Sequence, residues 1–300
     1  MAAGPTVTHR LQYVFLRSLE GAVARLSWER RVRFGVTLGR LWHVVDAAHR
    51  RIATENVRRA FPAWRDEEVR RLVKGNFENL GKTAVESIGL AHTTPAELLA
   101  RCRFEGLEHL EAALSEGQGV LALTGHLGNW ELGGLAMAAL GTPFYAVGRR
   151  QSNPLVDRRV TGLRESFGGT LIHHRNAVRP VLRALREGAM VAFLMDQRAR
   201  GREAVPSRFF GQPVATNQGL ALLALKSRAP VVPGFDERVD GGHVIRFQPQ
   251  LPRPKEGARE DQVRWFTESF DAAIETEVRR RPEQWFWVHR RWRLPVEWVS

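Results

Sequence analysis

From about residue 95 onward, short apolar runs alternate with helical stretches in this 300-residue sequence. Runs such as 120–123 and 190–194 are continuously apolar, which is typical of strands buried on both faces of a sheet. The predicted strands are 120–123, 144–147, 169–172, 190–194, 231–232 and 244–248, and the predicted helices are 132–140, 178–187, 218–226 and 262–280. Such alternation predicts an α/β fold, a sheet with helices on both faces.

The first ninety residues carry helical periodicity instead. In residues 7–26, apolar side chains recur at spacings of three and four, with Arg10, Arg17 and Arg25 between them. This pattern fits equally a basic amphipathic helix lying on a membrane and a helix packed on its own domain. Further helices are predicted around 34–45, up to 61–62, and over 67–90 with Asp66 as N-cap. We therefore expect a helical region over 1–94 and an α/β core over 95–300, together forming one compact unit.

Arginine supplies nearly all of the positive charge. Lys and Arg number 45 against 32 Asp and Glu, giving a formal charge of +13. Because arginine binds phosphate bidentately, we expect an anionic partner: nucleic acid, anionic lipid or an acidic carrier protein. An arginine-rich genome would produce the same bias without a function. The single cysteine, Cys102, excludes an internal disulfide framework and reads as a small half-buried residue.

Neither a membrane span nor a signal peptide is predicted. The uncharged stretch 132–148 is short for a span and contains glycines and Pro143. The N-terminus lacks the continuous apolar core and the cleavage site of a signal peptide. We expect the chain in the cytosol or on the cytosolic face of a membrane. The segment 198–213 is expected to be a long irregular loop, and 249–257 a surface connection.

The motif that carries chemistry is 124–131, Thr-Gly-His-Leu-Gly-Asn-Trp-Glu, between a predicted strand and a predicted helix. Active sites of α/β sheets lie at such carboxyl ends of strands. His126 suits a general base near neutral pH, and a carboxylate is needed to hold its tautomer. Glu131 would meet His126 only if His126 lies on the turn before the helix, because five residues span about 500° of a continuous helix. The alternative is a histidine that caps the helix.

Several blocks in order make the sequence recognisable. The His126–Glu131 block resembles the His-x4-Asp/Glu block of the bacterial lipid A biosynthesis (late) acyltransferases, within the lysophospholipid acyltransferase superfamily. The resemblance covers roughly residues 50 to 293. Further matching blocks are Glu55-Asn56-Val57 to Phe61-Pro62, Asn153-Pro154-Leu155-Val156-Asp157 with Arg164, Met195-Asp196-Gln197, Phe209-Phe210-Gly211 with Ala215-Thr216, and 282–292, Pro-Glu-Gln-Trp-Phe-Trp-Val-His-Arg-Arg-Trp.

The resemblance implies a mixed sheet flanked by helices, like that of glycerol-3-phosphate acyltransferase, and an O-acyltransferase. His126 would deprotonate an acceptor hydroxyl and Glu131 would orient His126. The hydroxyl would attack a thioester of acyl carrier protein or coenzyme A, with no cofactor and no covalent acyl-enzyme. Members usually begin with a transmembrane helix, but here arginines interrupt residues 7–26, so we expect peripheral attachment to the cytoplasmic face of the bacterial inner membrane.

Other residues receive binding roles. Arg149 and Arg164 would bind phosphate of the acceptor or of the phosphopantetheine carrier, unless they are solvated surface arginines. Asn129, Asp196 and Gln197 are expected to bind the substrate. Asp196 and Gln197 would do so by shaping the site through hydrogen bonds, although both equally suit a helix cap. Residues 289–291, His-Arg-Arg, fit packing better than catalysis. The predicted acyl slot is lined by Leu132, Leu135 and Met137, with Phe144 or Phe193 at its floor.

Three alternatives stay open. The acceptor of an enzyme of this kind is a lipid A precursor, a related glycolipid such as a phosphatidylinositol mannoside, or a lysophospholipid. A basic nucleic-acid-binding protein is a second class, but no helix-turn-helix, zinc module or RNA-recognition signature occurs, so we expect no nucleic acid. A membrane scaffold that has lost activity is a third, and the intact His126 and Glu131 argue against it. His173-His174 has no partner at metal-ligand spacing, so no metal is expected.

Overall fold

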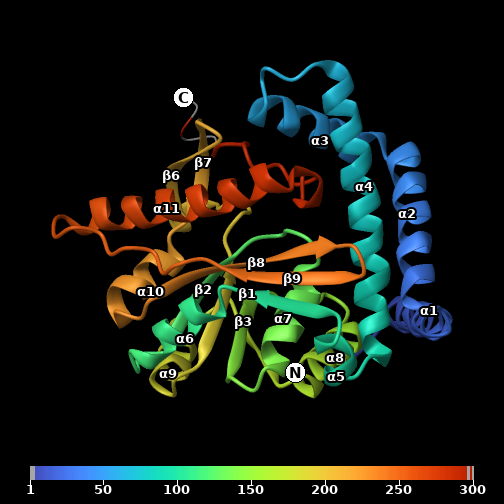
Figure 1. Cartoon of the computed structure of the whole chain (residues 1–300), viewed down its shortest axis with the longest axis horizontal. Helices are drawn as coiled ribbons and strands as arrows, with labels where there is room; N and C mark the ends of the chain where they lie inside the picture. Colours follow the sequence, from blue (N-terminus) through green and yellow to red (C-terminus); the bar gives the residue numbers. More distant parts are fainter. Residues whose placement is uncertain (1–3, 296–297, 299–300) are drawn as a thin grey trace.

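A computed structural model describes residues 4–295 and residue 298, and it confirms the predicted fold class. A mixed seven-stranded sheet forms the middle of the molecule, and helices flank it (Figure 1). In spatial order the strands are β1 (Cys102–Glu105), β9 (Gly242–Phe247), β8 (Val231–Val239), β2 (Val120–Thr124), β5 (Met190–Leu194), β3 (Phe144–Gly148) and β4 (Gly169–His173). Every neighbouring pair is parallel except β8 and β9.

The register of the central strands determines which residues lie side by side beyond the carboxyl ends of β2 and β5. Thr124 at the end of β2 pairs with Leu194 at the end of β5. Residues 126 and 196 each follow their strand end at the same distance along the chain. Because parallel strands end at one edge of the sheet, His126 and Asp196 are brought side by side.

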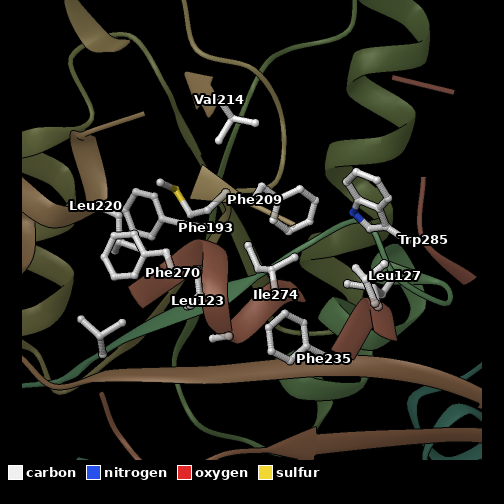
Figure 2. Close-up of a cluster of buried hydrophobic side chains, with 14 of the residues drawn as sticks. Leu123, Leu127, Phe193, Phe209, Val214, Leu220, Phe235, Phe270, Ile274 and Trp285 are labelled. Atoms are coloured by element: carbon white, nitrogen blue, oxygen red, sulfur yellow. The ribbon is translucent and has the colours of Figure 1, made fainter. Parts of the chain in front are cut away.

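Alternate residues of β2 and β5 face two separate cores, as the period of a strand requires. Leu121, Leu123, Val191 and Phe193 pack into one core. That core also takes side chains from α9 (Val178–Arg186), α10 (Gly219–Ser227) and α11 (Arg259–Arg280). Figure 2 shows side chains of α11 lying over those of the sheet.

The intervening residues of the two strands face the second core. Val120, Ala122, Met190 and Ala192 pack there with α6 (Leu107–Ser115) and α7 (Trp130–Ala139). The continuously apolar runs are therefore explained by burial on both sides of the sheet.

The N-terminal region contains the helices α1 (Val7–Ala24), α2 (Trp28–Val45), α3 (Ala47–Ala60) and α4 (Asp66–Gly89), and α2 and α4 run side by side along one end of the molecule (Figure 1). Helices α2 and α4 pack closely, since a Cβ on Gly39 would lie 2.1 Å from the Phe77 carbonyl oxygen. The predicted N-cap at Asp66 is wrong by one residue, because Arg65 is the N-cap and Asp66 begins the helix.

The segment 198–213 was expected to be irregular, and this expectation is wrong. It contributes to a β-hairpin of β6 (Ala204–Phe209) and β7 (Gln212–Asn217). The two residues between the strands, Phe210 and Gly211, both have positive φ, at 52° and 72°, which is the backbone of a tight hairpin turn. Pro206 and Pro213 are tolerated because the sheet has only two strands, so both are edge strands.

Several shorter elements were not predicted. They are β1, α5 (Pro95–Leu99), α6 and α8 (Pro154–Ser166), together with the 3-10 turns at 90–92, 201–203 and 282–284. Cys102 in β1 is half-buried, as expected. Among the described helices, none combines the length and the apolar character that crossing a membrane would require.

Candidate active site

His126 lies on the turn between β2 and α7, as the sequence predicted. Gly128 in this turn has φ +56°, and a Cβ there would lie 2.3 Å from Asp236 Oδ2, so only glycine fits. The Gly128 N–H donates to the Gln284 carbonyl at 3.1 Å. Leu127 bridges to Trp285. The C-terminal segment therefore fixes the turn that carries His126.

Asp196, and not Glu131, holds the His126 ring. The distance from His126 Nδ1 to Asp196 Oδ1 is 2.7 Å, and the His126 backbone N–H donates to Asp196 Oδ2 at 2.8 Å. Trp285 Nε1 donates to the same Oδ2 at 2.8 Å. Burial alone would raise the pKa of Asp196, but the nearby His126 ring and these hydrogen bonds lower it to about 2. An ionised Asp196 requires the proton on Nδ1, which leaves the Nε2 lone pair of a neutral ring free.

Glu131 pairs with Arg164 instead. Arg164 Nε donates to Glu131 Oε1 at 2.8 Å and Nη2 donates to Oε2 at 2.9 Å, a bidentate ion pair. The predicted contact between Glu131 and the His126 ring is therefore wrong. Both Glu131 and His126 nevertheless line one cavity. A role of Glu131 in catalysis stays a prediction, but it would not act by orienting the imidazole.

Aromatic side chains and one amide surround the imidazole. The Trp130 ring packs edge-on against it with centroids 4.8 Å apart, and the Phe286 ring lies 5.7 Å away. Gln197 Nε2 lies 3.3 Å from His126 Nε2. The free ring nitrogen therefore faces a position where a hydrogen-bond donor can sit.

The cavity beside His126 has a volume of about 580 Å³, which is in the usual range for small-molecule sites. Its lining is apolar in one part, where the predicted slot residues Leu135, Met137, Phe144 and Phe193 all contribute. Leu132 is fully buried in the core and does not belong to this lining, so that expectation is wrong. The polar lining includes Glu131, Arg149, Gln151, Arg164, His174, Gln197 and Arg198.

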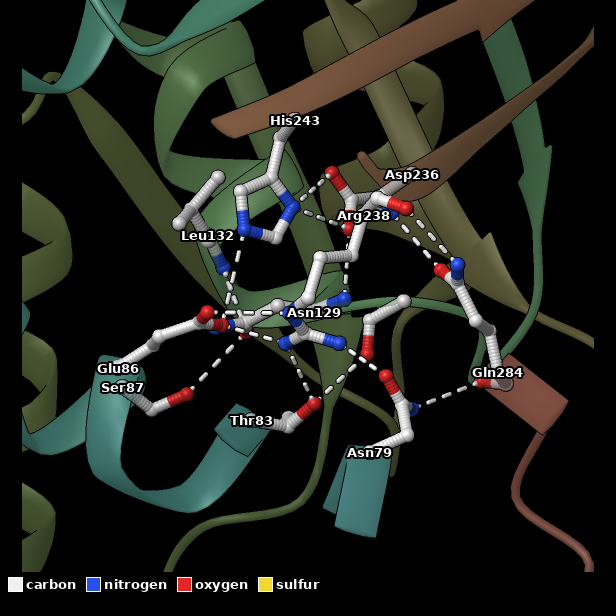
Figure 3. A network of polar contacts seen from close by, with 11 residues as sticks. Asn79, Thr83, Glu86, Ser87, Asn129, Leu132, Asp236, Arg238, His243 and Gln284 are labelled. Carbon is white, nitrogen blue, oxygen red and sulfur yellow. Dashed lines mark hydrogen bonds and ion pairs between the residues drawn. The ribbon is translucent and has the colours of Figure 1, made fainter. Parts of the chain in front are cut away.

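Asn129 does not reach the cavity, which corrects its predicted role in substrate binding. The side chain is fully buried and caps α7 by accepting from the Leu132 N–H at 3.1 Å. Its Nδ2 donates to Glu86 at 3.1 Å, and its backbone N–H donates to Asp236 at 2.6 Å. Figure 3 shows Asn129 at the centre of this polar network. Asn129 thus fixes the start of the helix that follows His126.

The network around Asn129 contains buried charges that compensate one another. Arg238 forms an ion pair with Glu86, and His243 lies 2.9 Å from an Asp236 carboxylate oxygen (Figure 3). Burial lowers the pKa of His243, but the Asp236 and Glu86 carboxylates raise it to about 9 overall. Thr83 on α4 donates to the Gly128 carbonyl at 2.8 Å. The N-terminal helical region therefore contacts and stabilises the turn that carries His126.

The remaining predicted site residues differ in whether they reach the cavity. Arg149 is exposed and lines the cavity, as does Gln197. Asp196 is only 2% exposed and lies behind the ring, so its predicted contact with substrate is wrong, whereas its hydrogen bonds to His126 agree with the expectation that it shapes the site. Arg291 is fully buried, donating to the Gln197 carbonyl at 2.9 Å and pairing with Asp271, which agrees with a packing role.

Sequence reasoning missed the roles of Trp285, Asp236 and His243. Trp285 stands in a quoted motif, but no spacing signals that its indole donates to a carboxylate 89 positions away. The described residues contain no cluster of three or more His, Cys, Asp or Glu side chains arranged to hold a metal. Chemically, the arrangement offers a carboxylate-held imidazole at the wall of an amphiphilic cavity, which suits removal of a proton from a bound hydroxyl.

Comparisons with known proteins identify a family and several relatives. The family model of the bacterial lipid A biosynthesis acyltransferases matches residues 13–294. A lipid A biosynthesis acyltransferase of Haemophilus influenzae is 28% identical over 279 residues, 91% of this chain and 84% of the relative. The lipid A biosynthesis palmitoleoyltransferase of Escherichia coli is 30% identical over 246 residues, 81% of this chain and 78% of the relative. A phosphatidylinositol mannoside acyltransferase of Mycobacterium tuberculosis is 32% identical over 131 residues, 43% of this chain and 42% of the relative.

Proposed function

The chain belongs to the bacterial lipid A biosynthesis acyltransferase family, and on that premise we propose that it moves a fatty acyl chain from an acyl thioester to a hydroxyl of a lipid A precursor or a related glycolipid. The observation that carries the proposal is the position of His126. Its ring is held by Asp196 on one side and lines an amphiphilic cavity on the other. An apolar slot next to a base is what transfer of a fatty chain to a hydroxyl requires.

In the proposed mechanism, His126 Nε2 takes the proton of the acceptor hydroxyl while the oxygen attacks the thioester carbonyl. The hydroxyl replaces the Gln197 amide, which lies 3.3 Å from Nε2 in the structure. The tetrahedral intermediate then collapses, the carbon–sulfur bond breaks, and the imidazolium returns its proton to the leaving thiolate. Asp196 stabilises the imidazolium throughout, because it stays ionised behind the ring. The reaction needs no cofactor and no covalent acyl-enzyme.

The Glu131–Arg164 pair has a different task in this proposal. Glu131 accepts from Nε and Nη2 of Arg164, and both side chains line the cavity. The guanidinium is thereby fixed in one orientation, and its Nη1 can donate to a phosphate or to the developing oxyanion. A guanidinium aimed where negative charge develops would stabilise the transition state.

The proposed site of action is the cytoplasmic face of the inner membrane, reached by peripheral attachment. On α1, Val7, Leu11, Val14 and Phe15 are between 61% and 74% exposed, and α2 adds Leu41, Val44 and Val45. Helix α1 also contacts the rest of the domain, since Asn153 Nδ2 donates to the His9 carbonyl at 2.9 Å. A helix anchored on one side and apolar on the other, with exposed arginines, fits a membrane rich in anionic lipid.

Vesicle flotation tests the attachment. Leu11→Ser with Phe15→Ser should reduce binding to anionic vesicles several-fold, whereas Leu140→Ser, which replaces an exposed leucine directly after α7, should not. Added salt should weaken wild-type binding, because exposed charges are screened over about 8–10 Å at physiological ionic strength. Unchanged flotation of the α1 variant would contradict the proposed surface.

Two choices of substrate remain within the proposal. The donor is an acyl thioester of either acyl carrier protein or coenzyme A, and the net charge of +13 suits both anionic carriers. The second candidate acceptor is a phosphatidylinositol mannoside or another membrane lipid, which the partial match to the mycobacterial enzyme favours.

A transfer assay tests the function directly. Purified protein is incubated with labelled acyl carrier protein or acyl-coenzyme A thioesters and with extracted glycolipid acceptors, and the products are identified by mass spectrometry. We expect wild-type protein to acylate a glycolipid hydroxyl and His126→Ala to lose about 10²- to 10⁴-fold in rate. Wild-type rates from a folded His126→Ala variant would refute the mechanism.

A further inference from the structure

Two arginines and two histidines lie where β3 and β4 end together, and Arg149 and His174 of this group line the cavity. Gly148 pairs with His173 in the parallel register, and the His174 N–H donates to the Gly148 carbonyl at 2.8 Å. The residues that follow on the two strands are therefore neighbours: Arg149 after β3, and His174 and Arg175 after β4. The His173 and His174 rings lie with their centroids 4.6 Å apart.

The arginines of this group form no ion pair in the described part of the chain. No carboxylate there lies within 4.0 Å of Arg149, Arg150 or Arg175, the distance that defines an ion pair. Two carboxylates of this part of the molecule accept hydrogen bonds from other groups. Asp157 accepts from the Gln151 N–H at 2.8 Å, and Glu203 on the cavity wall accepts from Asn217 at 3.0 Å. Like charges gathered without a counter-charge favour a ligand that supplies one.

The cavity wall defines which ligand could do so. Arg149 and His174 belong to the same lining as His126, and the apolar part of that lining is built by Phe144, Met190 and Phe247. A substrate that fits this cavity is therefore amphiphilic, with its hydrocarbon in the apolar part and its polar group beside Arg149 and His174. Arginine and imidazole together are typical ligands of a phosphate ester, because they donate several charge-assisted hydrogen bonds.

We propose that Arg149, His174 and Arg175 form a binding site for a phosphate ester of the substrate, at the cavity that contains His126. The inference rests on the proposed function, because the phosphate is carried by one of the two substrates. Its source is either the acceptor glycolipid or the phosphopantetheine arm of the donor. The site sets the depth at which the substrate lies, so that its reacting group reaches His126.

Binding is tested first without turnover. Inorganic phosphate is titrated into the purified wild-type chain, and the ring resonances of the histidines are followed by NMR. We expect the His173 and His174 resonances to shift with a saturating profile, and the shifts to be lost in a combined Arg149→Gln, Arg175→Gln variant. Arg264→Gln, which removes an exposed arginine from α11, is the matched control and should keep the wild-type shifts. The result of this phosphate titration does not depend on which lipid is the acyl acceptor.

Kinetics then identify the source of the phosphate. The combined variant should raise KM about tenfold or more for the substrate that carries the phosphate while kcat changes little, as loss of uniform binding does. A rise for the acceptor that disappears when the acceptor is dephosphorylated assigns the site to the acceptor. A rise for the donor assigns it to phosphopantetheine. Unshifted histidine resonances together with unchanged KM for both substrates would overturn the proposal.

Discussion

Replacing Asp196 by asparagine is the sharpest test of how His126 is activated. The two carboxylate oxygens of Asp196 have different partners. Oδ1 faces His126 Nδ1 alone, whereas Oδ2 accepts from both the His126 N–H and the Trp285 indole. An asparagine has only one acceptor oxygen, which will take the place of Oδ2 because two donors point there. Its amide N–H₂ then faces His126 Nδ1.

The consequence is a change of tautomer. An amide donor opposite Nδ1 requires an unprotonated Nδ1, which puts the ring proton on Nε2, where the base must be free. Asp196→Asn also removes the charge that stabilises the imidazolium. Loss of a general base costs about 10²- to 10⁴-fold in rate, and we expect kcat to fall to the severe end of that range, although every hydrogen-bonding position keeps a partner.

The assay compares three chains of equal fold, checked by circular dichroism. Wild type, Asp196→Asn and Asp240→Asn are assayed for acyl transfer at saturating donor and acceptor. Asp240 is an exposed carboxylate in the turn between β8 and β9, so its substitution controls for loss of a negative charge. A folded Asp196→Asn variant with a rate within about threefold of wild type would refute the argument that Asp196 fixes the tautomer.

Three further outcomes are expected. The folded pKa of His243, about 9, lies above its ordinary value of 6.5, so the stability that His243 contributes is complete below pH 6.5 and is lost as pH rises through 9. The free energy of unfolding in urea should therefore differ by up to about 3 kcal/mol between the two pH values, and His243→Gln should reduce that difference. Phe144→Leu enlarges the apolar part of the cavity and should shift donor preference to longer chains, by about fourfold per methylene at about 0.8 kcal/mol each, in a competition assay with mixed thioesters; an unchanged profile would place the slot elsewhere. Glu131→Gln keeps a hydrogen bond to Arg164 but not its charge, and should lower the rate of acyl transfer less than Asp196→Asn; a larger loss would contradict the ranking and make the Glu131–Arg164 pair the more important of the two.

Much of the framework could be predicted because it depends on local pattern. The runs 120–123 and 190–194 are apolar on both faces, so their place in the middle of the sheet follows from the sequence alone. The position of His126 directly after β2 follows from the same run and from the glycines around it. The hairpin over 204–217 could not be predicted in this way. Its turn residues are Phe210 and Gly211, and a phenylalanine with φ of 52° gives no turn signal.

The partner of His126 could not be read from spacing because two constraints compete. A separation of five residues makes Glu131 the obvious candidate along the chain, yet Asn129 caps α7 and places Glu131 in the first turn of the helix, where Arg164 takes it. Asp196 is 70 positions away in sequence, but β2 and β5 are paired in register, so both residues follow their strands at equal distance from the sheet edge. The partner of His126 is therefore the residue that follows the adjacent strand of the sheet. In a parallel sheet, a catalytic histidine after one strand is therefore best paired by searching the residues that follow the adjacent strands before those that follow along the chain.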